Sequence, residues 1–198
     1  LAIQSGKHLV TKVSLLFALM IFAGHPIAAL YGTIIIIIFS AFQCFKNKKS
    51  LLKIGSAIIL GLLISSIQLI PFYTLKTQSV RDEITYGDFA SGGITKNTAI
   101  SVINPFHSNF QYNVDLYFHF GTIALLLLII SPFFYKKFSP TNQKLYKIGA
   151  ALILTGFIFS LGNRFPQFYK ILYEIPPFNL ARIPARYLAI THFGIVFA

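Results

Sequence analysis

The sequence contains few residues of the kinds that bind metals, close disulfides or hold nucleotides. Cys44 is the single cysteine, so no disulfide can form within the chain. There is no Cys-x-x-Cys, His-x-x-x-His or Asp-x-Asp pair, no Walker-type phosphate loop and no Gly-x-Gly-x-x-Gly motif. We therefore expect no cofactor and no metal site, and a metal-bridged sugar phosphate has no support.

Charged residues are also scarce. They make up 11% of the chain, against 55% hydrophobic residues and a mean hydropathy of +0.69, which is too apolar for an ordinary soluble domain. The apolar residues gather in runs that we interpret as candidate membrane spans, at residues 9–23, 27–45, 54–71, 117–135, 148–161 and 187–198. The prediction is an all-α fold, a polytopic transmembrane helix bundle with about six spans.

The two ends of the chain resemble cuts rather than natural termini. The first residue is Leu1, no signal peptide precedes the first run, and the last run stops at Ala198. We expect residues 1–198 to be a single transmembrane domain and a fragment of a larger protein.

The charges between the runs alternate in kind. One set of ends carries only lysines, which is typical of the cytoplasmic side of a membrane protein: Lys7, Lys12, Lys46, Lys48, Lys49, Lys53, Lys136, Lys137, Lys144 and Lys147. The other set holds every arginine and every acid. We therefore attribute the net charge of +12 largely to lysines that orient the chain in the membrane and contact membrane lipids. We expect no nucleic-acid partner.

Two outer segments follow from this orientation. Residues 72–116 form a long outer loop with interfacial aromatics, and residues 163–186 form a second, interfacial segment. Aromatic and leucine side chains between Phe165 and Tyr173 recur at helical spacing, which predicts a short amphipathic helix that ends before Pro176.

Gly24-His25-Pro26 predicts a tight turn between the first two spans, with a single kinked helix or a re-entrant pair as the alternative.

Arg182-x-Pro184-x-Arg186 is the strongest candidate site. Proline restricts its own backbone and biases Ile183 toward extended geometry, so two guanidinium groups would flank a stiff turn at the outer surface. Arginine offers a planar set of donors suited to phosphate. The alternative is that both arginines contact lipid headgroups or helix ends.

Two weaker candidates lie on the same outer side. Arg81 precedes Asp82 and Glu83, so an arginine could orient a phosphate beside a general base, or the three could form a solvated charge cluster. His25 lies in an apolar turn, where binding and a satisfied interfacial histidine are equally compatible with the pattern. His192 lies within the last run and could pair with a helix outside this chain.

Several of these elements occur in an order that resembles the YfhO-like bacterial membrane proteins, of the GT-C class of polytopic glycosyltransferases. The matching residues are Gly24-His25-Pro26 with Tyr31, Gln68-Leu69-Ile70-Pro71 with Ser79-Val80-Arg81, Asn104-Pro105 with Tyr117 and Gly121, and Gly162 with Pro166 ahead of Arg182-Ile183-Pro184-Ala185-Arg186.

The resemblance implies a multi-pass enzyme of the bacterial cytoplasmic membrane that moves a sugar from a polyprenyl-phosphate carrier to a cell-envelope acceptor. It suggests Arg81, Arg182 and Arg186 as carrier-phosphate contacts, with His25 as a further substrate-binding candidate. The catalytic carboxylate of such enzymes usually lies in an earlier outer loop, so the base is unassigned. The alternative is a non-catalytic transporter or an assembly partner for lipid-linked sugars.

Overall fold

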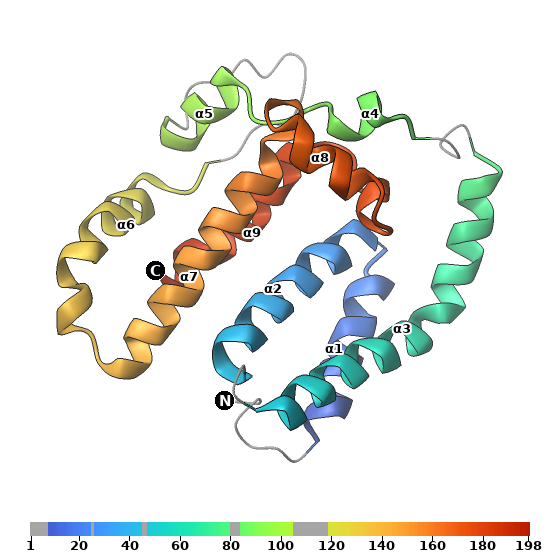
Figure 1. Cartoon of the computed structure of the whole chain (residues 1–198), viewed down its shortest axis with the longest axis horizontal. Coiled ribbons are helices and arrows are strands. Elements are labelled where there is room, and N and C mark those ends of the chain that lie inside the picture. Colours follow the sequence, from blue (N-terminus) through green and yellow to red (C-terminus); the bar gives the residue numbers. More distant parts are fainter. Residues whose placement is uncertain (1–7, 25, 45–46, 80–83, 105–118) are drawn as a thin grey trace. The chain divides into compact units, whose positions relative to one another are not determined.

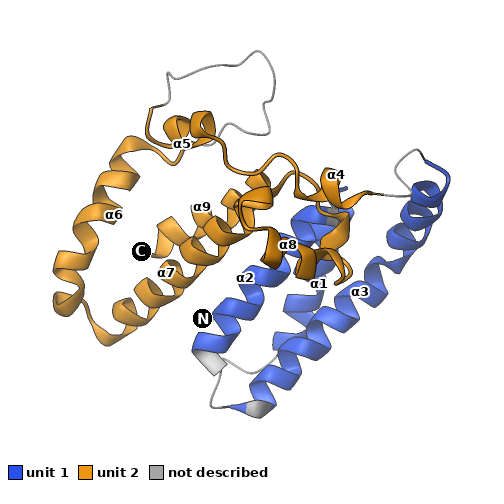
Figure 2. Ribbon diagram, turned by 45° about the horizontal axis from the view of Figure 1, so that its top comes forward, with its two compact units in different colours: residues 1–83 blue, residues 84–198 orange. Residues whose placement is uncertain are grey.

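The chain folds into helices. In the computed structural model, which describes residues 8–24, 26–44, 47–79, 84–104 and 119–198, every regular element is helical, and no strand occurs in these ranges. The predicted all-α class is confirmed. The chain divides into two compact units, residues 1–83 and 84–198 (Figure 2).

Unit 1 consists of three apolar helices, α1 (Leu9–Phe22), α2 (Pro26–Cys44) and α3 (Lys48–Thr77) (Figure 1). Its contacts join α1 to both other helices, and its buried core is small: Leu9 packs on Ile54, and Phe17 and Ile21 pack with Ala29. Gly61 lets α3 approach α1, because a Cβ there would lie 2.9 Å from the Ser14 carbonyl oxygen.

The predicted break between the first two helices is confirmed. α1 ends at Phe22, Gly24 follows with a φ of 87°, and α2 begins at Pro26. Only glycine adopts such a φ at little cost, and proline suits the first helical position because its missing N–H has no intrahelical partner there. Two separate helices form, as the turn motif predicts.

α3 is longer than the sequence predicts. We expected the third run to end at Pro71, whereas the helix continues through that residue to Thr77. Proline removes one intrahelical hydrogen bond and bends a helix without always ending it. Figure 1 shows α3 bending along its length.

The expected count of about six spans is not confirmed. Of the described helices, α3 alone is long and apolar enough to cross a membrane, over Lys49–Thr77, while α1 and Ile27–Phe42 of α2 are apolar but shorter. α6 (Thr122–Phe134) has 13 residues and α9 (Leu188–Phe197) has 10, whereas a span takes about 20. Lysines at the start of α7 (Pro140–Ser160) lower the hydropathy of that helix.

Unit 2 is built on the close packing of α7 against α9. Glycines make this possible: a Cβ on Gly149 would lie 2.7 Å from the Gly194 carbonyl oxygen, and one on Gly156 would lie 2.6 Å from the Thr191 nitrogen. Small residues let helix backbones approach in this way. α7 starts where the Ser139 side chain accepts a hydrogen bond from the Asn142 N–H at 3.3 Å.

The predicted long outer loop contains regular structure. Within residues 72–116 the structure describes α4 (Tyr86–Ala90) and α5 (Lys96–Ile103), each capped by a threonine, in addition to the end of α3. The predicted amphipathic helix is confirmed as α8 (Pro166–Tyr173). Short 3-10 turns connect the remaining elements: η2 (Tyr135–Lys137), η3 (Gly162–Arg164), η4 (Phe178–Leu180) and η5 (Pro184–Tyr187).

An aromatic cluster joins α4 to α8. Phe89 and Tyr169 are fully buried with ring centroids 5.4 Å apart, and the Tyr173 hydroxyl donates a hydrogen bond to the Ile84 carbonyl oxygen at 2.7 Å. The Tyr169 hydroxyl donates to the Phe159 carbonyl at the end of α7. α4 therefore covers part of the apolar face of α8 that the sequence predicts to lie against the membrane interface.

Candidate functional site

The segment 182–186 has an unusual backbone. Ile183 has φ 62° and ψ 77°, in the left-handed region, rather than the extended geometry that the following proline predicts. A β-branched residue there is a genuine outlier and costs about 1–3 kcal/mol, so surrounding contacts must hold it in place. One local and one long-range contact do so: the Arg186 N–H donates to the Ile183 carbonyl at 3.0 Å, and the Ala185 N–H donates to the distant Gly92 carbonyl at 3.1 Å.

Three chain segments meet where this backbone is held, and we call this meeting point the glycine junction (residues 90–94, 160–162 and 183–185). Gly92, with φ 73°, lies against Ile183, and a Cβ on Gly162 would lie 3.1 Å from Pro184 Cγ. A Cβ on Gly93 would lie 2.5 Å from the Leu161 carbonyl oxygen. The Ile94 N–H donates to the Ser160 carbonyl at 2.9 Å, so the segments are also hydrogen-bonded.

The arginines are less buried than Pro184 and Ala185, which lie between them. Pro184 and Ala185 are buried in the junction, whereas Arg182 and Arg186 are half-buried and keep part of their surface open. Among the residues that the structure describes, no carboxylate forms an ion pair with Arg182. Two guanidinium groups on a backbone with little freedom suit an anion with several oxygens, because less entropy is lost on binding than from a mobile loop.

The structure brings together two of the four predicted binding residues. Arg182 and Arg186 share the turn into α9, while Arg81 and His25 lie outside the described residues, so their assignment stays a prediction. Of the acids, Asp88 accepts a hydrogen bond from the Thr85 hydroxyl at 2.7 Å within the capping turn of α4. That geometry gives Asp88 a role in capping the start of α4.

Sequence reasoning missed the contribution of the glycines and tyrosines. Ser91-Gly92-Gly93 is a glycine-rich stretch of the sequence, but its partner segments are far away in the chain and no local pattern identifies them. The tyrosines of α8 repeat at helical spacing, which predicts the helix but not that their hydroxyls reach the backbone at Ile84 and Phe159. Positive φ angles at Gly92 and Gly162 are the feature that marks the junction.

His192 has partners within the chain. Its Nε2 atom lies 3.2 Å from the His119 carbonyl oxygen, and its ring meets Phe120 edge-on with centroids 4.2 Å apart. The His119 Nδ1 atom lies 3.1 Å from the Val102 carbonyl oxygen. These contacts tie α9 to the end of α5, which is a structural role.

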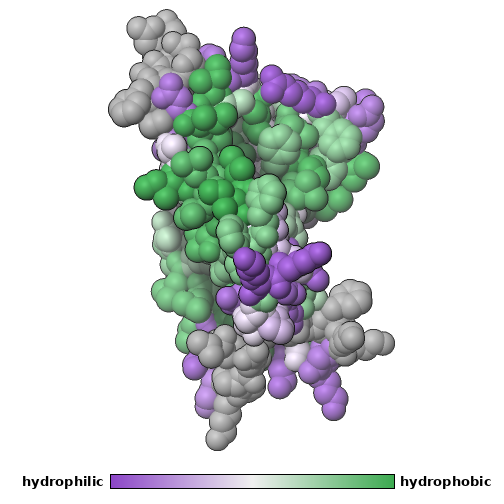
Figure 3. Space-filling model, turned by 90° about the vertical axis from the view of Figure 1, so that its left-hand side faces the viewer, coloured by the Kyte–Doolittle hydropathy of each residue, from purple (hydrophilic) through white to green (hydrophobic). Residues whose placement is uncertain are grey.

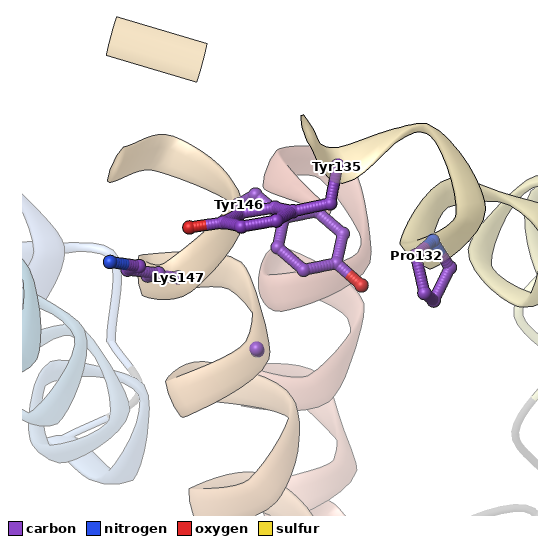
Figure 4. A pocket seen from close by; sticks show the side chains of 5 residues that line it. Pro132, Tyr135, Tyr146 and Lys147 are labelled. Atoms are coloured by element: carbon purple, nitrogen blue, oxygen red, sulfur yellow. The ribbon is translucent and has the colours of Figure 1, made fainter. Parts of the chain in front are cut away.

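A second feature of unit 2 is a hollow of about 420 Å³ beside the turn from α6 to α7 (Figure 4). Pro132 and Tyr135 line it on one side, and Tyr146, Lys147 and Ala150 of α7 line it on the other. This hollow is at the lysine-rich end of the two helices, whereas the arginine segment adjoins the other end of α7.

In the described part of the chain, no group of three histidine, cysteine or acidic side chains lies close enough together to hold a metal ion. Comparison of the chain with protein-family models, with curated proteins and with solved structures finds no match. The function is therefore inferred from the physical chemistry of the site.

Proposed function

We propose that this protein is a multi-pass membrane glycosyltransferase of the GT-C type, similar to the YfhO-like proteins, that uses a polyprenyl-phosphate-linked sugar at the outer face of the bacterial cytoplasmic membrane. The observation that carries the proposal is the pair Arg182 and Arg186, held on either side of the left-handed Ile183 by the glycine junction. Strained backbone that is held by several contacts tends to occur at functional sites.

The surface of unit 1 supports a membrane location. In its most apolar window α3 has a mean hydropathy of 2.0, yet only 22% of that window is buried, and Ile67 keeps 76% of its side chain exposed. A helix in the core of a water-soluble domain would be covered, and large exposed apolar areas mark contact with a membrane or a partner. Lipid is the simplest cover for such a helix.

The six-span arrangement belongs to this proposal. At 1.5 Å per residue, the 19 residues of α2 and the 21 residues of α7 extend about 28 Å and 32 Å, close to the hydrocarbon thickness of about 30 Å. α1, α6 and α9 are shorter, so flanking residues must complete those spans, with lysines reaching the interface.

The chemistry follows from the charge on the leaving group. An acceptor hydroxyl oxygen forms a bond to the anomeric carbon, while the bond from that carbon to the phosphate oxygen breaks and its electron pair goes to the phosphate. Arg182 and Arg186 stabilise the developing negative charge with donors that are already in position. The hydroxyl proton goes to a base that this chain does not assign.

The test uses the full-length protein in liposomes with radiolabelled polyprenyl-phosphate sugar and envelope acceptors. We expect Arg182→Ala and Arg186→Ala each to reduce label transfer by about 100-fold, a typical loss for one donor to a developing oxyanion. Arg164→Ala is the matched control: Arg164 is exposed in η3, outside the constrained turn, and its loss should leave transfer unchanged.

The outcomes separate the alternatives. Full transfer in both arginine variants would end their assignment. Label that binds or crosses the membrane without forming a new glycosidic bond would replace the transferase with a non-catalytic transporter or assembly partner for lipid-linked sugars. Arg182→Lys distinguishes recognition from charge alone, because a lysine keeps the charge and loses the paired donors.

A further inference from the structure

The hollow between α6 and α7 takes no part in the proposed transfer reaction, and its walls are formed by aromatic packing. Tyr135 and Tyr146 are half-buried with ring centroids 5.3 Å apart, and Phe138 meets Tyr146 at 6.2 Å. The Gln143 side chain donates a hydrogen bond to the Phe138 carbonyl at 3.0 Å, which fixes the turn that joins the helices. The hollow therefore exists before any ligand binds.

Polar groups gather at its mouth. Figure 4 shows the Tyr135 hydroxyl and the Lys147 ammonium group pointing to the same side, while the Tyr146 hydroxyl points toward Pro132. A lysine and a tyrosine hydroxyl both donate hydrogen bonds, so this edge of the hollow suits an acceptor such as a phosphate oxygen.

The surrounding charge has one sign. Lys136, Lys137, Lys144 and Lys147 lie within the turn and the first part of α7, and the sequence has no acidic residue between Asp115 and Glu174. No internal carboxylate of these helices neutralises the lysines. The local excess of positive charge favours an anion over a zwitterion.

The helix beside the hollow is apolar and uncovered. None of the residues of α6 is buried, and Ile123 and Phe133 keep 75% and 82% of their side chains exposed. In Figure 3, which looks onto the side that carries α6, hydrophobic residues in green cover much of the visible surface. An apolar chain could lie along α6 while a charged head occupies the hollow.

We propose that this hollow and the adjoining face of α6 bind one anionic glycerophospholipid of the cytoplasmic leaflet. Lys147 and the Tyr135 hydroxyl hold its phosphate, Lys136 adds charge at the turn, and its acyl chains lie along α6. Basic pockets between helices on the cytoplasmic side bind anionic headgroups by this chemistry. The inference depends on the membrane location in the proposed function and not on the transfer reaction.

The experiment measures which lipid stays with the protein. The full-length protein is reconstituted in vesicles with equal parts of phosphatidylcholine and phosphatidylglycerol and extracted in mild detergent, and retained lipid is counted by native mass spectrometry. We expect phosphatidylglycerol to be retained in preference. Lys147→Gln and Lys136→Gln should each lower its retention about fivefold, the change that corresponds to about 1 kcal/mol per surface lysine.

Two further variants sharpen the test. Tyr135→Phe keeps the aromatic packing and removes one donor, so retention should fall by a smaller factor. Lys96→Gln is the matched control, because Lys96 is an exposed lysine on α5, which precedes the opposite end of α6. Water-soluble glycerophosphoglycerol, which carries the headgroup without acyl chains, should not displace the lipid.

The contrary results distinguish the lipid site from the membrane location. The inference would be wrong if both lipids were retained equally, or if the Lys96 variant lost as much lipid as the other lysine variants. It would also be wrong if the soluble headgroup displaced the lipid, or if polyprenyl phosphate were retained in place of phosphatidylglycerol. None of these results would affect the transferase assay. Insertion into vesicles of phosphatidylcholine alone is measured separately. Failure to insert would remove the membrane location and both proposals with it.

Discussion

The two units of this protein reach stability by different means. Unit 1 is three apolar helices whose hydroxyl side chains bond to the preceding turn of their own helix, as Thr33 does with Ala29 at 2.8 Å and Ser56 with Leu52 at 2.9 Å. In unit 2, tyrosine hydroxyls and backbone N–H groups reach other segments, including Tyr173 to Ile84. Several hydroxyls of unit 1 thus bond within their own helix, whereas several polar groups of unit 2 bond to partners far away in the chain.

This difference explains where the candidate site lies. Irregular backbone exposes N–H and C=O groups, and near a membrane these groups need partners within the protein. The glycine junction supplies such partners to the turn that carries Arg182 and Arg186. Two arginines on a regular helix would need no such partners for their backbone. The contacts that hold this turn therefore indicate that its backbone conformation is important.

The largest expected effect is at Gly162. Gly162→Ala places a side chain at a φ of 59°, where its Cβ would lie 2.7 Å from the Ala90 carbonyl oxygen, so we expect a loss of about 3 kcal/mol. Thermal unfolding of the solubilised full-length protein measures it. Gly55→Ala is the control from unit 1: nothing lies within 4 Å of its Cβ position, and alanine should stabilise α3 by about 0.5–1 kcal/mol. Similar behaviour of the two variants would contradict the contrast between the units.

The next effect concerns the contact of α7 with α9. A Cβ on Gly156 would lie 2.5 Å from Thr191 Oγ1 and 2.9 Å from the Tyr187 carbonyl oxygen, so the helices must separate. We expect Gly156→Ala to destabilise the protein by about 2 kcal/mol in the same unfolding measurement. Gly87→Ala, at an exposed position of α4 with its nearest contact at 3.7 Å, should be neutral or slightly stabilising. An unchanged melting temperature for Gly156→Ala would show that this packing can adjust.

A smaller effect is expected at the tyrosine hydroxyls. Tyr173→Phe removes the 2.7 Å hydrogen bond to Ile84 and should cost about 1 kcal/mol. Tyr86→Phe removes a longer bond, 3.3 Å to the Pro166 carbonyl in an exposed position, and should cost less. Hydrogen exchange of the α4 and α8 amides measures both. Equal protection in the two variants would mean that packing alone joins these helices.

The smallest effect tests unit 1. The Asn47 side chain accepts a hydrogen bond from the Ser50 N–H at 3.3 Å at the start of α3, in an exposed position. Asn47→Ala should cost about 0.5 kcal/mol, and Asn47→Ser should restore most of it, because serine also caps helices. Helical content by circular dichroism during thermal unfolding is the readout. A loss as large as that at Gly162 would show that unit 1 depends on more than local signals.

Predictions from the sequence succeeded where neighbours in the chain decide the outcome. The break after Phe22 and the helix Pro166–Tyr173 follow from glycine, proline and periodic aromatics, and the structure confirms both. They failed at Pro71, where α3 continues, and at Ile183, where contacts with Gly92 hold a conformation that its own proline neighbour disfavours. Tertiary contacts outweighed local preference in the second case.

The all-helical class and the apolar runs follow from composition and from the order of residues, because helix formation and hydropathy depend on residues a few positions apart. The shape of the arginine turn does not. It depends on Gly92, Gly162 and Ile183 meeting across large sequence separations, and on glycines whose missing side chains permit that approach. Only the packed structure decides which backbone segment each glycine packs against. The reason is that a stable packing leaves few buried polar groups unpaired in the unit as a whole.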